Sequence, residues 1–282
     1  MLQKTREWLA LILIGFLPLH ALLVTVGTKF LEGPGSAPLP VLALWKEALI
    51  LIILIFAALE WIKTEKQDRA LLKVDKFDVC ILLLVILSLI VTATTHGNWK
   101  LYLFGFKYDF VPLITFVILR RVQWSEGFSR AAINVILTLG GLVAAYGLAT
   151  LVLPMSFFRA LGYSDLHSLY LPDAPLAAFQ QIGGGGVRRI QSTLSGPNQL
   201  GLWLILPWSF GIVLLFSSWF RAEHPLLHIG AQQSKKQYLI YVLYVALIGA
   251  ALLFTFSRTA WIAAVAVAIT FIVMNHPKHG AI

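Results

Sequence analysis

Two arginine-containing stretches, residues 188–198 and 256–261, lie where polar sequence meets apolar sequence. The first carries Arg188 and Arg189 and runs directly into an apolar stretch of about twenty residues, long enough to cross a membrane. In the second, Arg258 interrupts an otherwise nearly continuous apolar run. A guanidinium group presents planar, bidentate N–H donors that suit a phosphate or a pyrophosphate. The two stretches therefore predict an anion-binding site at one membrane surface.

A second interpretation of Arg258 stays open from the residues alone. An arginine at the membrane edge costs at least a few kcal/mol unless it is paired or faces a polar cavity. Arg258 has almost no acidic residue near it in sequence, and its side chain could instead reach lipid headgroups from a tight turn between two helices. The neighbouring Arg188 and Arg189 favour the anion site, as does a helix that starts at Pro197 and Asn198 with free backbone N–H groups.

The composition is that of an integral membrane protein. Of the 282 residues, 59% are hydrophobic and only 12% are charged, against about 25% in a soluble domain. The net charge of +9 is spread between apolar stretches and forms no continuous basic face, so no nucleic-acid partner is predicted. The single cysteine, Cys80, excludes an intrachain disulfide and a cysteine-based metal cluster. Neither a metal nor another cofactor is predicted, and membrane lipids are the expected surroundings.

The apolar stretches predict an all-α fold, a polytopic transmembrane helical bundle that forms a single domain over residues 1–282. About eight spanning helices are expected, near residues 8–28, 42–62, 79–95, 101–119, 131–153, 199–220, 238–256 and 259–274. In the fourth, Lys107 and Asp109 would lie near the membrane. A short interfacial helix followed by a shorter span is therefore the alternative there.

Residues 154–197 are predicted to form one long, irregular outer loop that leads into the first arginine-containing stretch. A loop of this length is unusual unless it is functional or disordered. The glycine run at 183–186 lacks the lysine and serine of a phosphate-binding loop and indicates a flexible linker. If the N-terminus is cytoplasmic, 14 of the 22 lysines and arginines lie on that side, as the positive-inside rule requires. Residues 154–197 and Arg258 then share the outer face.

Few residues on this face are suited to acid–base catalysis. His96 and His167 are the outer histidines, and either could act as a general base, although lone loop histidines are more often only solvated. No pair of carboxylates stands out, so glycoside hydrolysis by two carboxylates is not supported.

Both arginine-containing stretches resemble signatures of one family. Residues 189–201 read RIQSTLSGPNQLG and resemble the signature of the O-antigen ligase and O-antigen polymerase family, in which an arginine precedes a Pro-Asn pair that opens a membrane helix. Residues 255–261 read TFSRTAW and are similar to the later Ser-Arg signature of that family. The resemblance is specific over about residues 185–270. Ser192 departs from the pattern, because the family often has glycine there.

The resemblance implies a membrane glycosyltransferase of the bacterial cytoplasmic membrane. Such an enzyme transfers or polymerises a glycan from an undecaprenyl-pyrophosphate-linked donor to a glycan, lipid or protein acceptor at the outer face, without a metal. The resemblance also implies that Arg189 and Arg258 are catalytic residues that bind and neutralise the donor pyrophosphate. Supporting substrate-binding residues would be Arg188, Asn198 and Ser257.

In the family, a histidine on a large outer loop after the Ser-Arg signature activates the acceptor. No matching loop is present in these 282 residues. We therefore expect this chain to correspond to the N-terminal portion of the family pattern and to be catalytically incomplete.

Two other classes of function stay open. A transporter or flippase of an anionic lipid-linked substrate could use the same arginines, and would be expected to have interrupted helices near the middle of the membrane. A non-catalytic membrane module would depend on neither arginine.

Overall fold

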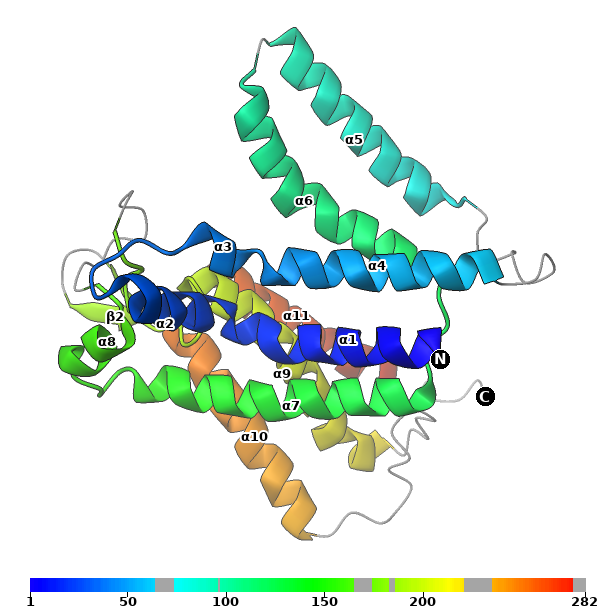
Figure 1. The fold of residues 1–282 in the computed structure, drawn as a ribbon. Coiled ribbons are helices and arrows are strands. Elements are labelled where there is room, and N and C mark those ends of the chain that lie inside the picture. Colours follow the sequence, from blue (N-terminus) through cyan, green and yellow to red (C-terminus); the bar gives the residue numbers. More distant parts are fainter. Residues whose placement is uncertain (64–73, 96, 165–173, 183–185, 221–234, 276–282) are drawn as a thin grey trace, which may run out of the picture. The chain divides into compact units, whose positions relative to one another are not determined.

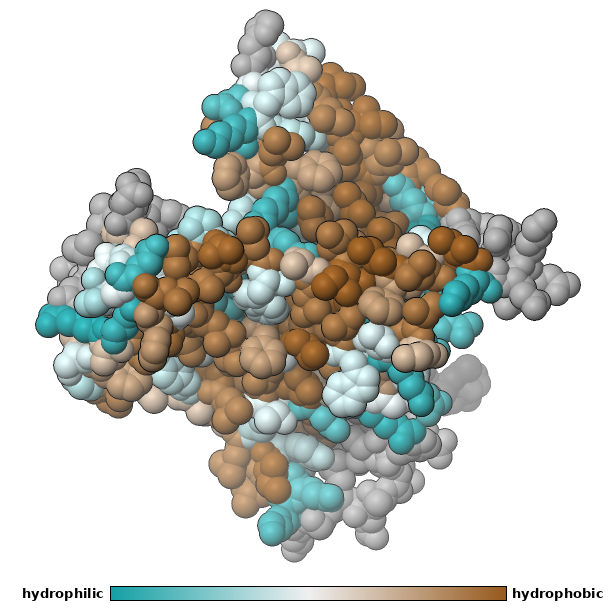
Figure 2. Space-filling model, in the orientation of Figure 1, coloured by the Kyte–Doolittle hydropathy of each residue, from teal (hydrophilic) through white to brown (hydrophobic). Residues whose placement is uncertain are grey.

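The chain is a mostly helical multi-pass membrane protein in the computed structural model, which describes residues 1–63, 74–95, 97–164, 174–182, 186–220 and 235–275 (Figure 1). Within these ranges, 7 helical stretches are long and apolar enough to cross a membrane, and the stretch from Arg258 to Met274 is a shorter apolar helix. Hydrophobic residues cover much of the sides of the helices (Figure 2). All eight predicted spans therefore correspond to apolar helices.

The helices belong to two compact units. The first comprises Met1–Ala10 and Lys46–Ser125, and the second Leu11–Trp45 and Glu126–Ile282. The helices of the first unit are the start of α1 (Leu2–Phe16), α4 (Trp45–Lys63), α5 (Lys76–Thr94) and α6 (Trp99–Leu119). The helices of the second unit are α2 (His20–Glu32), α3 (Pro40–Ala43), α7 (Glu126–Ala149), α8 (Met155–Leu161), α9 (Pro197–Phe220), α10 (Lys235–Phe254) and α11 (Arg258–Asn275).

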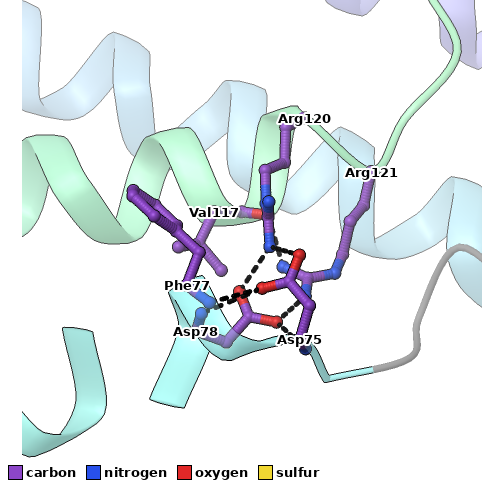
Figure 3. A network of polar contacts seen from close by, with 6 residues as sticks. All are labelled: Asp75, Phe77, Asp78, Val117, Arg120 and Arg121. Carbon is purple, nitrogen blue, oxygen red and sulfur yellow. Dashed lines mark hydrogen bonds and ion pairs between the residues drawn. The ribbon is translucent and has the colours of Figure 1, made fainter. Parts of the chain in front are cut away.

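Helices α5 and α6 form a hairpin that is pinned at its open end by charged residues (Figure 3). Asp75 and Asp78 form a capping box that satisfies the first N–H groups of α5. Arg120 Nη2 lies 2.7 Å from Asp75 Oδ2 and 2.8 Å from Asp78 Oδ1, and Arg121 also pairs with Asp78. The backbone N–H of Asp78 and the Arg120 guanidinium hold the pKa of Asp75 below its usual range. The sequence-local cap and the long-range ion pairs thus fix the same end of the hairpin.

Helix α6 is a single helix of 21 residues, not an interfacial helix followed by a shorter span. Its charged residue Lys107 places Nζ 2.7 Å from Glu47 Oε1 of α4, and Lys46 Nζ lies 3.6 Å from the same oxygen. Pairing lowers the cost of a charge within a membrane helix. The apolar stretch can therefore continue through Lys107.

A buried arginine ties α1 to the rest of the first unit. Arg6 is fully buried, with Nε 3.0 Å from Glu60 Oε1 and Nη2 donating to the Gln123 carbonyl at 2.6 Å. Its guanidinium carbon lies 4.1 Å from the centre of a ring of Trp124. These contacts offset part of the free-energy cost of burying the guanidinium, whose Nη1 has no hydrogen-bond partner among the described residues.

The core of the second unit lies where α9 packs against α7, α10 and α11. Small and aliphatic side chains fill it: Val143, Ala144, Ile190, Leu200, Leu204, Ile248, Ala251, Leu252, Ala260 and Ala264. Ile190 comes from the segment before α9, so the first arginine-containing stretch is part of this core.

The first predicted span, 8–28, is interrupted in the structure. Helix α1 ends at Phe16, a 3-10 turn (η1, Leu17–Leu19) follows, and α2 begins at His20. Pro18 has no backbone N–H and cannot continue the hydrogen-bond ladder of α1. The apolar composition predicted this helical stretch but not its break.

The segment between α7 and α9, expected to be irregular, has secondary structure of its own in its described part. It contains α8 and an antiparallel hairpin of β1 (Gln180–Ile182) and β2 (Val187–Arg189). Phe158, Tyr163 and Phe179 pack together as a small apolar cluster beside them. Residues 183–185 of the predicted glycine linker lie outside the described residues.

Candidate anion-binding site

The two arginine-containing stretches are in direct contact, as the sequence predicted. The backbone N–H of Ile190 donates to the Phe254 carbonyl at 3.1 Å. Arg189 Nε donates to the Thr255 carbonyl at 2.9 Å, and its Nη2 lies 3.4 Å from the Phe256 carbonyl oxygen. Arg189, the last residue of β2, therefore places its side chain against the turn between α10 and α11.

Arg189 is held by neutral oxygen atoms. Besides the two carbonyl groups, its Nη1 donates to Gln180 Oε1 at 3.0 Å and its Nη2 to Asn198 Oδ1 at 2.8 Å. No acidic side chain among the described residues forms an ion pair with it. Partial burial lowers the pKa of the guanidinium, which nevertheless remains charged at neutral pH. Arg189 thus contributes a positive charge that its immediate surroundings do not neutralise.

Arg258 is placed differently. It is the first residue of α11, it is exposed, and its side chain forms no hydrogen bond or ion pair with the described residues. The chain reverses between α10 and α11 at Phe256, which adopts the left-handed backbone conformation with φ of 50°. Only Ser257 separates Phe256 from Arg258, so their Cα atoms are at most about 7.6 Å apart. Arg258 therefore follows closely in sequence the turn that Arg189 contacts, and its guanidinium donors have no partner among the described residues.

The predicted supporting residues lie in the same part of the second unit. Asn198 is exposed in the first turn of α9, where it accepts from Arg189. Ser257 is buried directly before α11, and its carbonyl accepts the Trp261 N–H at 3.0 Å. Arg188 points elsewhere from β2, with its guanidinium carbon 4.5 Å from the centre of the Phe179 ring. A cation–π contact therefore holds Arg188 against the small apolar cluster.

Three polar residues that the sequence did not predict as site residues fix the chain after Arg189. Gln191 Nε2 donates to the Ala177 carbonyl, Ser192 Oγ to the Val143 carbonyl at 2.7 Å, and Thr193 Oγ1 to the Pro18 carbonyl at 2.7 Å. All three are buried. In the sequence these residues are a short polar run before an apolar helix. Such runs are common in loops and do not indicate which contacts the residues make. Successive residues here bond to different parts of the unit.

Two glycines allow these close approaches. A Cβ added at Gly147 of α7 would lie 3.2 Å from Ser192 Cβ, and one added at Gly201 of α9 would lie 2.7 Å from Ala260 Cβ. Ser192 itself has φ of 53°, a conformation in which glycine carries no steric cost. The departure from glycine at this position is therefore accommodated, and the serine hydroxyl gains the hydrogen bond to Val143.

Neither histidine that the sequence predicted as a general base can be placed. His96 and His167, the outer histidines of the prediction, both lie outside the described residues. Among the described residues, no group of three or more histidine, cysteine, aspartate or glutamate side chains is arranged to hold a metal ion. The groups in this arrangement that suit an anion are the guanidinium donors of Arg189 and Arg258.

No protein-family model matches this chain, and neither a curated protein nor a solved structure matches it.

Proposed function

We propose that the chain is a polytopic membrane glycosyltransferase similar to O-antigen ligases and polymerases. It would transfer or polymerise a glycan from an undecaprenyl-pyrophosphate-linked donor at the outer face of the bacterial cytoplasmic membrane. The observation that supports this most is the contact between residues 189–198 and 254–258. There Arg189 at the end of β2 bonds to the turn before α11, Arg258 begins α11, and neither has a carboxylate partner among the described residues. A pyrophosphate would supply the missing negative charge.

The two arginines have different roles in this proposal. Arg258 contacts the pyrophosphate directly, because its five N–H donors have no described partner. Arg189 uses most of its donors to hold Asn198 and the turn before α11, and adds its positive charge to the site. In the reaction, an acceptor hydroxyl oxygen bonds to the anomeric carbon while the bond from that carbon to the pyrophosphate breaks. Fixed positive charge stabilises the departing pyrophosphate, and the hydroxyl proton passes to a base.

Binding of undecaprenyl pyrophosphate to the purified full chain tests the site. The Arg258→Ala variant should bind about 10- to 100-fold more weakly than the wild type, because a hydrogen-bonded charge is lost. Arg258→Lys should remain clearly weaker than the wild type, since lysine supplies charge without the planar fork. Arg130→Ala is the control, because Arg130 is exposed and pairs only within its own helix, with Glu126 at 3.1 Å. Equal affinity in all four proteins would instead support lipid-headgroup contact by Arg258.

One observation favours the transporter or flippase alternative: the first helical stretch, Leu2–Glu32, is interrupted at Leu17–Leu19. Interrupted helices often line transport pathways. Proteoliposomes with a fluorescent undecaprenyl-pyrophosphate-linked oligosaccharide separate the two functions. Movement of the lipid across the bilayer would support transport, whereas binding of the lipid without such movement, or transfer of its glycan to an added acceptor, would support the glycosyltransferase.

A further inference from the structure

Thr193 occupies the break in the first helical stretch. Its hydroxyl donates to the Pro18 carbonyl at 2.7 Å, and its own carbonyl accepts the Leu22 backbone N–H at 3.2 Å. In a continuous α-helix, the N–H of residue 22 would bond to the carbonyl of residue 18. Thr193 therefore takes the place of one helical hydrogen bond by standing between its donor and its acceptor.

This contact is built into the interior of the second unit. Pro18 and Thr193 are both buried, and water has little access to the groups that they satisfy. An unpaired polar group at such a place is costly, so the break and Thr193 stabilise one another. Insertion of a side chain into the hydrogen-bond ladder is a recognised cause of helix kinks.

The same short segment carries the candidate anion-binding site at both ends. Arg189 lies four residues before Thr193, and Asn198 lies five residues after it in the first turn of α9. Between them, Ser192 bonds to α7 and Thr193 bonds to the break between α1 and α2. A displacement of Thr193 would be transmitted to both site residues, because only a few residues of chain separate them.

We propose that Thr193 is a positioning residue that fixes the candidate anion-binding site against the interrupted first span. This inference rests on the proposed function, since it assigns the purpose of the contact to the placement of Arg189 and Asn198 for a pyrophosphate. A misplacement of about 1 Å at a binding group can lower a rate about 100-fold. The first span thereby becomes part of the site without contacting the ligand.

Four variants of the full chain test the inference: Thr193→Val, Thr193→Ser, Pro18→Ala and Thr150→Val. Thr193→Val keeps the shape and removes the hydroxyl, and Thr193→Ser keeps the hydroxyl. Pro18→Ala permits a continuous helix in which Leu22 bonds to residue 18 and no longer to Thr193. Thr150→Val is the matched control, because Thr150 directly after α7 is equally buried but its hydroxyl donates to the nearby Gly147 carbonyl, three residues earlier.

Two measurements are made on each protein. Hydrogen–deuterium exchange of residues 17–22 and 190–193 reports the contact, and the Kd for undecaprenyl pyrophosphate reports the site. We expect Thr193→Val to speed exchange of the Leu22 amide about tenfold and to weaken binding about tenfold. Thr193→Ser should restore both values, and Thr150→Val should change neither even at an equal loss of thermal stability. Pro18→Ala should protect the Leu22 amide and still weaken binding.

The outcomes separate this inference from the proposed function. If the wild type binds undecaprenyl pyrophosphate and Thr193→Val binds it equally well, the positioning role alone is overturned. Unchanged exchange at Leu22 in Thr193→Val would overturn the contact itself. A wild type that does not bind the lipid would overturn the proposed function, and with it the purpose assigned to Thr193.

Discussion

Arg189 and Arg258 carry the same functional group in different surroundings. Arg189 donates to four protein oxygens, two of them backbone carbonyls of the turn before α11, whereas Arg258 has no partner among the described residues. The sequence singled out both arginines and predicted that the two stretches that carry them share one site. It could not predict the division between them, because backbone carbonyl acceptors carry no residue-type signal and depend on how the turn is folded.

Substitution of Arg189 by lysine should therefore destabilise the fold as well as the site. One ammonium group cannot reach Gln180, Asn198 and both carbonyl oxygens, so several partners lose a donor. We expect the free energy of unfolding in detergent to fall by about 2 kcal/mol or more. Arg130→Lys is the control and should change it by less than about 0.5 kcal/mol, because its ion pair with Glu126 is on the surface. A similar stability of the two variants would contradict the structural role of Arg189.

At the scale of elements, hydropathy predicted the positions of the helices because lipid requires long apolar stretches whatever their neighbours are. It did not predict α8 or the hairpin of β1 and β2, whose order depends on a small cluster of aromatic residues such as Phe158 and Phe179. Nor did it predict that Thr193 replaces a helical bond at Pro18, since the partner lies 175 residues away in sequence. The local hydropathy pattern thus predicts where the helices lie. The contacts that interrupt or order them join residues far apart in sequence, and hydropathy does not predict these contacts.

The close approach of α9 to the start of α11 gives a prediction at this scale. Gly201→Ala would place a Cβ 2.7 Å from Ala260 Cβ and 3.2 Å from Ser257 Cβ, and these atoms can move away only with their backbone. We expect a net loss of unfolding free energy of about 1–3 kcal/mol and weaker binding of undecaprenyl pyrophosphate. Gly105→Ala in α6 is the control. Its nearest atom is 3.9 Å away, so the higher helix propensity of alanine should stabilise that variant by up to about 1 kcal/mol. Stabilisation of both variants would contradict the tight packing at Gly201.

For the whole molecule, composition and hydropathy were sufficient to predict a multi-pass membrane protein, and the helices of the described residues confirm this coarse description. The side of the membrane on which the candidate anion-binding site lies is a separate property. It is predicted only from the distribution of lysine and arginine between the ends of the spans, which favours a cytoplasmic N-terminus by the positive-inside rule. The proposed donor is used at the outer face, so the orientation bears directly on the function.

Helix α7 offers a direct test of this orientation. Its 24 residues extend about 36 Å, enough to cross a hydrocarbon core of about 30 Å. Gln123 precedes the helix, Ser156 follows it, and both are exposed. In a Cys80→Ala background, which removes the one native thiol, we expect a cysteine at position 156 to react with a membrane-impermeant maleimide in intact cells. A cysteine at position 123 should react only after permeabilisation, which also serves as the control for thiol reactivity. The reverse pattern would put the segment that carries Arg189 in the cytoplasm and exclude transfer at the outer face, and labelling of both positions in intact cells would mean that α7 does not cross the membrane.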